Sequence, residues 1–188
     1  MRPPSVRQQQ LLEAAYAHTL EHGFAGLSLR PLAAAIGSSP RVLLFLFGSK
    51  EGLIRALLAR ARADELAMLD RLRAAGPSLD LPATMTAVWE WLSSDAHRPL
   101  LAVWAEAYGR ALVEPDGPWA GFAEATVRDW LALIAGAQPH RHARSRTGVV
   151  QQTLALAVLR GAMLDLLATG DADRTTAAVT AYIAGLRT

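Results

Sequence analysis

The residues of this sequence that could do chemistry are mostly cations and hydroxyls near its amino terminus. Arg41 and Lys50 flank a short apolar run, and Ser28, Ser39 and Ser49 stand where helices could begin. An arginine can donate two hydrogen bonds to the acceptor pair of guanine, and a lysine at a helix start can bind a phosphate. These residue types therefore indicate contacts to nucleic acid.

The charge of the chain is unevenly distributed. Residues 1–60 hold seven cations against three acids, whereas residues 61–188 hold twelve cations against fourteen acids. A basic first third followed by a mildly acidic remainder favours a nucleic-acid-binding segment on a body with another role. A difference of this size also arises in ordinary soluble proteins, so it supports the prediction only together with a motif.

Catalytic and metal-binding residue sets are absent from the sequence. The chain has no cysteine, which excludes disulfides, thiolate metal sites and cysteine nucleophiles. No glutamate is followed three residues later by a histidine, and His140 and His142 lie in an arginine-rich loop without acidic partners. Phosphate-binding glycine loops and nucleophile elbows are missing too. We therefore expect no catalytic residues, no metal, no cofactor and no enzyme; a helical enzyme is the weakest alternative.

Two short predicted helices, joined by a tight turn, must position the amino-terminal cations. Ser28 is expected to cap the first helix with its side-chain oxygen, and Gly37 to end it in a conformation of positive φ. Ser39 and Pro40 begin the second helix, which carries Arg41. Helix, short turn and helix is the geometry that places a second helix in the DNA major groove.

An ordered set of residues extends this motif in both directions. Its members are Leu12, Ala14, Ala15, His22-Gly23-Phe24, Ser28-Leu29, Leu32-Ala33, Ile36-Gly37, Ser39, Phe47, Ser49-Lys50-Glu51 and Leu53. No single member is specific, but with this set the stretch from Leu11 to Leu57 resembles the DNA-binding domain of TetR-type transcription regulators. The resemblance implies double-stranded DNA as a partner. The candidate DNA-binding residues are Arg7, Ser28, Arg30, Ser39, Pro40, Arg41, Leu44, Phe45, Ser49 and Lys50.

The second helix departs from the family pattern at two positions. The family usually has a tyrosine there, often followed by a basic residue or a histidine, whereas this sequence has Leu44 and Phe45. An exposed Leu-Phe pair is unusual on a surface that contacts phosphates. Three interpretations are open: the pair contacts thymine methyl groups, DNA binding is weakened, or the two side chains pack against the core of their own domain.

The rest of the chain has a helical pattern throughout. Apolar spacing predicts further helices over residues 6–22, 50–75, 81–96, 99–111, 119–137, 147–168 and 172–186, with a polar loop over 138–146. Gly76-Pro77 is expected to end the long fourth helix. The predicted fold is all-α with about nine helices: a three-helix DNA-binding head with a helix-turn-helix, residues 1–49, and a larger helical ligand-binding and dimerisation bundle, residues 50–188.

No stretch of the sequence predicts a membrane anchor. There is no uninterrupted run of eighteen or more apolar residues and no apolar signal-peptide core near Met1. We therefore expect a cytoplasmic protein without a membrane partner.

Large amphipathic rings gather in the body of the chain, where leucine and alanine would suffice for a core. They suit a pocket for a small apolar or aromatic ligand, although ordinary core is an equal interpretation for about half of them. Glu106 and Arg110 are expected to form a solvated pair four residues apart. The predicted ligand-binding residues are Met85, Trp89, Trp104, Tyr108, Phe122, Thr126, Trp130 and Met163.

The last two predicted helices carry small residues that would let helices approach closely. In the resembled family this pair packs against its symmetry mate, so the resemblance implies a homodimer. The predicted dimer-interface residues are Val150, Leu154, Ala157, Gly161, Leu164, Ala178 and Tyr182.

The sequence therefore predicts a ligand-responsive transcriptional regulator. We expect a repressor that binds a palindromic operator as a homodimer and is released by a small, largely apolar ligand. The alternative is a dimeric small-molecule-binding protein with weak or lost DNA binding.

Overall fold

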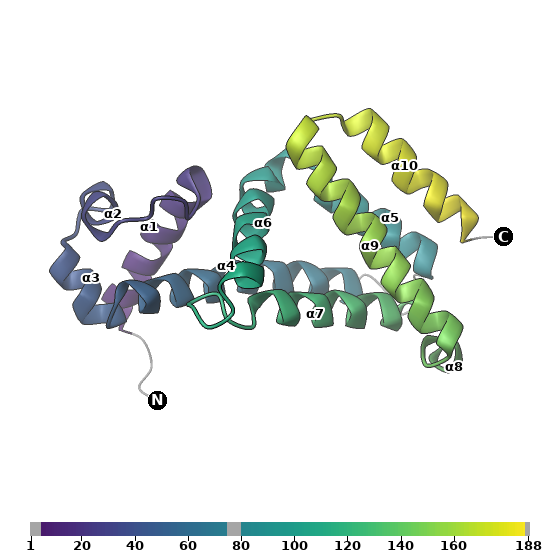
Figure 1. Ribbon diagram of the computed structural model, residues 1–188, viewed down its shortest axis with the longest axis horizontal. Coiled ribbons are helices and arrows are strands. Elements are labelled where there is room, and N and C mark those ends of the chain that lie inside the picture. The colour runs from purple at the N-terminus through teal and green to yellow at the C-terminus, as the bar shows by residue number, and fades with distance from the viewer. Residues whose placement is uncertain (1–4, 75–79, 187–188) are drawn as a thin grey trace. The chain divides into compact units, whose positions relative to one another are not determined.

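The computed structural model describes residues 5–74 and 80–186, and all their regular secondary structure is helical (Figure 1). This confirms the predicted all-α fold. The helices are α1 (Val6–His22), α2 (Leu29–Ala35), α3 (Pro40–Phe47), α4 (Lys50–Ala74), α5 (Leu81–Leu92), α6 (Arg98–Val113), α7 (Phe122–Gly136), α8 (His140–Ala143), α9 (Arg146–Thr169) and α10 (Ala172–Gly185), with a 3₁₀ turn at Asp95–His97.

The predicted boundaries differ from the structure in three places. The expected polar loop contains the one-turn helix α8, closed by a hydrogen bond from Ala143 N–H to the Pro139 carbonyl at 2.9 Å. Helix α5 ends at Leu92. The Trp91 carbonyl oxygen, which would accept a backbone hydrogen bond if the helix continued, instead lies 2.9 Å from Nδ1 of the His97 ring. Helix α7 begins three residues later than expected, after a turn. The predicted terminator Gly76-Pro77 lies outside the described residues.

The chain folds into two compact units. Unit 1 comprises the residues up to Asp64 together with Ala102–Ala123, and unit 2 comprises Glu65–Leu101 and the residues from Glu124 onward. The predicted boundary at residue 50 divides the chain by role, whereas this division follows packing. Helices α4, α6 and α7 each contribute to both units.

The core of unit 1 is built from apolar positions at helical spacing in the first four helices. Burying each leucine side chain of this core fully contributes about 1.5–3 kcal/mol. The core residues of α1 to α4 are Leu11, Ala15, Leu32, Ala33, Leu43, Leu53 and Leu57, each at most 2% exposed. Because the short helices α2 and α3 share this core, their relative direction is fixed by packing.

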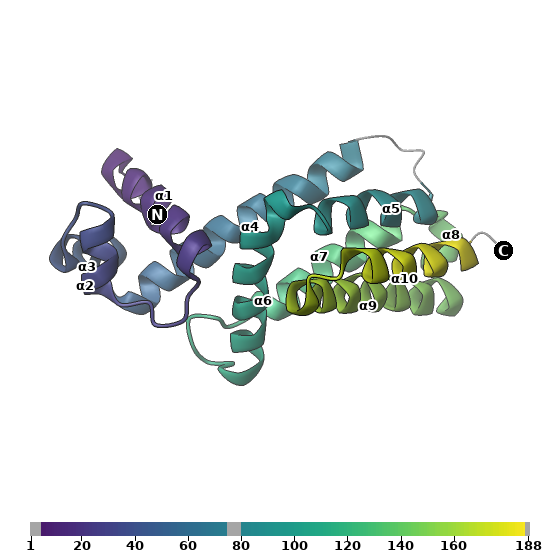
Figure 2. The ribbon, with the colours of Figure 1, turned by 90° about the horizontal axis from the view of Figure 1, so that it is seen from above.

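In unit 2, helices α5, α9 and α10 lie side by side (Figure 2). Their inward side chains interlock as a helical layer, with Met85, Val88, Leu159, Met163 and Val179 no more than 3% exposed. Met163 and Met85 have flexible, polarisable side chains that fill irregular gaps between such helices.

Helix α9 is the described helix that is long and apolar enough to cross a membrane by length and composition alone. This is weak evidence, because the core helices of soluble proteins have the same composition. The inward face of α9 packs against α5 and α10, and polar side chains such as Gln151, Thr153 and Asp165 interrupt its surface.

Candidate functional site

The predicted recognition helix α3 stands at a large angle to the helix before it. The axes of α2 and α3 are bent by 103° relative to each other across the Ile36–Ser39 turn. This lies in the range of about 90–120° that is typical of a DNA-binding helix-turn-helix. Gly37 has a φ of 63°, as predicted, and such a conformation suits glycine because it has no side chain.

The ends of α3 are fixed by local hydrogen bonds. The Ser39 hydroxyl accepts from the Val42 backbone N–H at 3.3 Å, and Pro40 occupies the first turn, as predicted. The Gly48 N–H donates to the Leu44 carbonyl at 2.8 Å. In addition, the Gln8 side-chain amide of α1 donates to the Leu46 carbonyl at 2.9 Å. Gln8 therefore ties α1 to the end of the recognition helix, a contact that no local pattern could reveal.

The outward face of α3 exposes one cation and three apolar side chains. Arg41 is exposed, Val42 is 37% exposed, Leu44 is 41% exposed and Phe45 is 85% exposed. Leu43 points the other way and is fully buried. Of the three interpretations of Leu44 and Phe45, packing of Phe45 against its own domain is therefore wrong.

The other predicted DNA contacts lie on the surface of the head. Arg7, Ser28, Arg30, Ser39 and Lys50 are exposed, while Pro40 and Ser49 are partly buried. The Ser49 hydroxyl caps α4 by accepting from the Gly52 N–H at 3.0 Å. Ser28 precedes α2, but its hydroxyl makes no capping hydrogen bond, so the predicted side-chain cap is wrong. The exposed hydroxyl is consequently available to other partners.

The start of α4 also carries an acid beside the predicted phosphate contact Lys50. The pKa of Glu51 lies below its ordinary value because its carboxylate accepts hydrogen bonds from its own backbone amide and from the Ser49 hydroxyl. A carboxylate that remains ionised there partly offsets the positive charge of Lys50.

This geometry is that of a known family. Residues 11–57 match the family model described as bacterial regulatory proteins, tetR family. The amino-terminal domain of the chain is therefore a TetR-type DNA-binding domain.

Solved structures with the same fold extend over nearly the whole chain. The multidrug binding protein EbrR, complexed with proflavin, is 25% identical, covers 94% of this chain and 99% of its own, and has a TM-score of 0.67. The EbrR complex with imidazole gives 25% identity, 94% and 89% coverage and a TM-score of 0.66. A TetR transcription regulator from Haloarcula marismortui is 16% identical over 95% of this chain and 96% of its own, with a TM-score of 0.71. No curated protein matches the chain.

The TetR-type head is held to the part of α6 that belongs to unit 1. The Phe24 N–H, in the connection that leads to α2, donates to Glu106 Oε2 at 2.7 Å. Glu106 Oε1 accepts from Arg110 Nε at 3.3 Å, and the Arg110 guanidinium lies 5.3 Å from the centroid of the Trp119 ring. Trp119 in turn meets Phe24 edge to face at 4.9 Å. The predicted pair between Glu106 and Arg110 is therefore present, but the Glu106 carboxylate is only 24% exposed and also accepts a hydrogen bond from the Phe24 backbone.

A second polar cluster joins α1 to α4 within unit 1. The buried Tyr16 hydroxyl donates to Asp64 at 2.9 Å, and Arg60 donates to Glu13 at 2.8 Å and also to Asp64. Burial and the hydrogen bond to Asp64 raise the pKa of Tyr16, so its hydroxyl stays protonated as a donor. The cluster holds the first half of α4 against the head.

The predicted ligand-binding residues fall into both units. Trp104 and Tyr108 are half-buried in unit 1 and stack at 5.0 Å, and Phe122 is 7% exposed in the same unit. The remaining five belong to unit 2, where all are buried: Met85, Trp89, Thr126, Trp130 and Met163. The Trp89 indole donates to the Thr176 hydroxyl at 3.1 Å.

The interior of unit 2 contains an acid that sequence analysis missed. Glu65 on α4 is only 5% exposed, and its Oε1 accepts from the Trp130 indole N–H at 2.5 Å. The Thr126 hydroxyl, one turn before Trp130 on α7, is fully buried without a hydrogen-bond partner. Glu65 stands four residues after Ala61 and four before Leu69, which are both buried. This spacing was the signal that could have placed it inside.

Two open grooves lie outside the predicted ligand set. One of about 420 Å³ in unit 2 is lined by residues that include Leu81, Gln138 and His142. The other, of about 400 Å³ in unit 1, is lined by residues that include Lys50 and Trp119. Neither groove is lined by any of the eight predicted ligand-binding residues. Within the described residues, no three metal-ligating side chains gather.

The predicted dimer-interface residues share the outer surface of the α9–α10 hairpin. Val150, Leu154 and Leu164 are 52%, 51% and 44% exposed. Ala157, Gly161 and Ala178 are exposed as well, and Tyr182 is partly buried, which raises the pKa of its hydroxyl. This apolar surface has no partner within the described residues of the chain.

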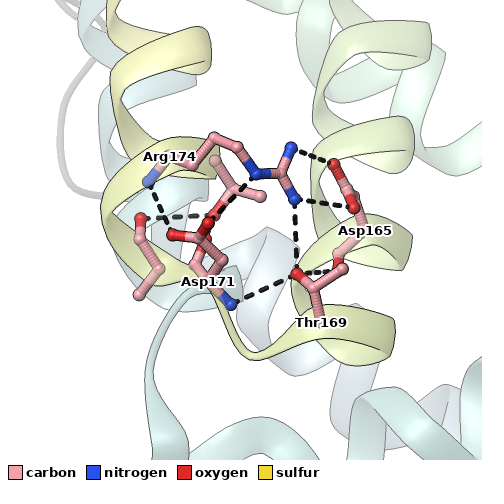
Figure 3. Close-up of polar contacts among 6 residues, drawn as sticks. Asp165, Thr169, Asp171 and Arg174 are labelled. Atoms are coloured by element: carbon pink, nitrogen blue, oxygen red, sulfur yellow. Dashed lines mark hydrogen bonds and ion pairs between the residues drawn. The ribbon is translucent and has the colours of Figure 1, made fainter.

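An ion-pair network closes the end of the hairpin (Figure 3). Arg174 of α10 donates to Asp165 of α9 at 2.7 and 2.9 Å and to Asp171 in the connection at 3.1 Å. Thr169 accepts another hydrogen bond from Arg174 at 3.3 Å. The network fixes the direction in which α10 leaves α9, and so sets the shape of the hairpin surface.

Proposed function

We propose that this TetR-type regulator is a repressor that binds a palindromic operator as a homodimer and is released by a small, largely apolar ligand. The observation that carries the proposal is α3, which stands at 103° to α2 with Arg41 exposed on its outer face. In this arrangement α3 enters the major groove, Arg41 donates to a guanine, and Lys50, Arg30 and Arg7 bind backbone phosphates. Such a regulator acts in the cytoplasm, where its DNA is, and needs no enzymatic activity.

The DNA-binding part of the proposal is tested by selecting duplexes from a random pool with the full-length protein. The affinity for the most strongly enriched duplex is then measured across a salt series. Arg41→Ala is expected to weaken binding about 5- to 150-fold for each half-site and to relax the preference at one position of each half-site, because one bidentate contact to guanine discriminates by about 1–3 kcal/mol. Lys50→Ala is expected to weaken binding to every sequence alike and to reduce the salt slope.

Arg128→Ala is the matched control, since Arg128 is an exposed arginine of unit 2 that pairs with Glu124 at 3.8 Å. It is expected to leave both the affinity and the preference unchanged. A protein that enriches no sequence, with Arg41→Ala indistinguishable from Arg128→Ala, contradicts the proposal.

The proposed homodimer is supported by the exposed apolar surface of the α9–α10 hairpin. A monomer would leave Val150, Leu154 and Leu164 in water, and a two-fold contact would bury them against their own copies. Leu154→Glu should therefore shift the protein from dimer to monomer in analytical ultracentrifugation. Leu112→Glu is the control, because Leu112 is 64% exposed on α6 and lies outside this surface.

The proposed ligand site is the interior of unit 2, lined by Met85, Trp89, Thr126 and Trp130. EbrR, which has the same fold, is described as a multidrug binding protein and was solved with proflavin and with imidazole. The buried carboxylate of Glu65 and the buried Thr126 hydroxyl would give a largely apolar ligand two polar contacts. Quenching of tryptophan fluorescence by apolar aromatic compounds, lost in Trp130→Phe, would support this site.

A specific observation favours the alternative of a small-molecule-binding protein with weak or lost DNA binding. Leu44 and Phe45 add apolar surface where the family usually has polar groups. If no duplex is enriched while tryptophan fluorescence still titrates with apolar compounds, the alternative holds and repression does not.

A further inference from the structure

The outer face of α3 is more apolar than a phosphate-binding surface requires. Successive residues of an α-helix are rotated by about 100°, so Leu44, Arg41, Phe45 and Val42 lie in this order within about half of the circumference. Phe45 is in the middle of this face and is 85% exposed, and Leu44 and Val42 flank it at 41% and 37%. We call these three side chains the apolar face of α3.

The side chains of the apolar face do not belong to the core of the domain. The core-facing side chain of this helix is Leu43, which is fully buried, and both ends of α3 are held by the Ser39 cap and the Gly48 N–H. Phe45 therefore points outward in a helix whose orientation is fixed on both sides. A phenylalanine this exposed leaves much apolar area in water unless a partner covers it.

The major groove of DNA offers one apolar group to such a surface. Guanine, cytosine and adenine present hydrogen-bond donors and acceptors there, whereas thymine adds its C5-methyl group. Apolar side chains placed over donors or acceptors would strip them of water without replacing their hydrogen bonds, which costs free energy. The partner that complements Phe45 in this groove is therefore a thymine methyl.

The position of Arg41 adds a spacing. Arg41 and Phe45 are four residues apart, and so about 6 Å apart along the helix axis. This is less than two base-pair steps of about 3.4 Å. A guanine bound by Arg41 should therefore have a thymine within about two base pairs, on the side that faces Phe45.

We propose that Phe45, flanked by Leu44 and Val42, reads the C5-methyl groups of thymine and is a specificity-determining residue of the recognition helix beside Arg41. This inference rests on the proposed operator binding. In this proposal the preference for A·T pairs comes from burial of the thymine methyl group, and Arg41 supplies the guanine contact. The surrounding cations bind backbone phosphates, whatever the sequence.

The test uses the full-length protein and the operator selected above. Each thymine of one half-site, and its symmetry mate, is replaced in turn by deoxyuridine, which pairs identically but lacks the methyl group. Burying one methyl group corresponds to about fourfold in affinity, so losing one methyl contact from each of the two half-sites should weaken wild-type binding roughly fifteenfold. Uracil at positions away from α3 should have no effect.

The variant Phe45→Ala separates methyl reading from general weakening. It should bind thymine DNA about as weakly as wild type binds the uracil DNA, and it should no longer distinguish the two, since the pair of changes removes the same contact. Phe45→Leu keeps an apolar side chain and should retain part of the difference. Leu112→Ala, at an exposed apolar position of α6, is the control and should behave as wild type.

The outcomes separate the inference from the function on which it rests. If wild type binds a selected operator but tolerates uracil at every position, or if Phe45→Ala still discriminates uracil, the inference is overturned and operator binding stands. If wild type enriches no duplex at all, both the inference and the proposed operator binding are contradicted. Circular dichroism of Phe45→Ala is expected to match wild type because the side chain is 85% exposed, so lost binding cannot be ascribed to unfolding.

Discussion

The hydrogen bond between Phe24 and Glu106 leads to a sharp prediction about unit 1. The bond joins residues 82 positions apart in the sequence, and at 2.7 Å it is a charge-assisted bond of short length. Glu106 is 24% exposed, so its carboxylate is only partly screened by water. A hydrogen bond to a charged group contributes about 1.5–3 kcal/mol, and we expect Glu106→Ala to lower the free energy of unfolding by about 2 kcal/mol.

The assay is urea unfolding followed by tryptophan fluorescence. With an m-value of about 2 kcal/mol/M, the midpoint should fall by about 1 M while the slope stays unchanged. Glu114→Ala is the control, because Glu114, directly after the end of α6, pairs with the same Arg110 at 3.3 Å but is 46% exposed. It should lower stability by no more than about 0.5 kcal/mol. If the two variants have equal midpoints, the reasoning that assigns the stabilisation to the Phe24 contact is refuted.

Gly23 offers an independent check of the same contact. Its φ of 73° and ψ of −172° belong to a region that glycine occupies almost alone, and a Cβ there would lie 2.9 Å from Glu106 Oε2. Gly23→Ala therefore strains the backbone and also displaces the carboxylate that Phe24 needs. When Gly23→Ala is combined with Glu106→Ala, there is no carboxylate left to displace, so Gly23→Ala adds only its backbone strain. The double variant should therefore lose less free energy of unfolding than the two single variants lose together.

Three further predictions concern other polar contacts. Asp165→Asn should destabilise the protein at neutral pH, because hydrogen bonds from Arg174 hold the pKa of Asp165 below its ordinary value of 3.8. The difference in stability between wild type and variant should shrink below about pH 3.8 as the wild-type carboxylate is protonated. Unfolding midpoints of both proteins from about pH 7 to about pH 3 measure this difference. Trp130→Phe should lower the free energy of unfolding by about 1–3 kcal/mol in urea, since the buried carboxylate of Glu65 loses a donor. Tyr16→Phe should cost about 1 kcal/mol in the same assay, because Asp64 is partly open to water and can be resolvated.

The parts of the fold that sequence could predict depend on neighbours along the chain. Ser39, Ser49 and Asp80 cap helices as their sequence positions indicate, since a cap needs only the next three residues. Ser28 is the exception, because its hydroxyl makes no capping hydrogen bond to the first turn of α2. The exposure of Phe45 was left open by the sequence, and the structure decides it because the fully buried Leu43 sets the helical phase that turns Phe45 outward.

Contacts between distant segments could not be predicted in this way. Helical spacing placed Glu106 and Arg110 on one face correctly, but it contained no information that Phe24 would lie against that face. Glu65 was missed because a carboxylate is rarely buried, and only the approach of Trp130 from α7 makes its burial tolerable. The ligand set was chosen by residue type, which cannot tell that Trp104 and Trp130 belong to different units.

The apolar face of α3 and the α9–α10 hairpin both expose apolar side chains, and charge distinguishes the partners we propose for these two surfaces. The apolar face of α3 is accompanied on unit 1 by the exposed cations Arg30, Arg41 and Lys50, which would repel a second copy but attract phosphates. On the α9–α10 hairpin, by contrast, Arg174 is already paired with Asp165 and Asp171. A self-complementary contact there would bury apolar surface without bringing unpaired like charges together. The same apolar exposure therefore fits DNA on α3 and a second copy of the chain on the hairpin.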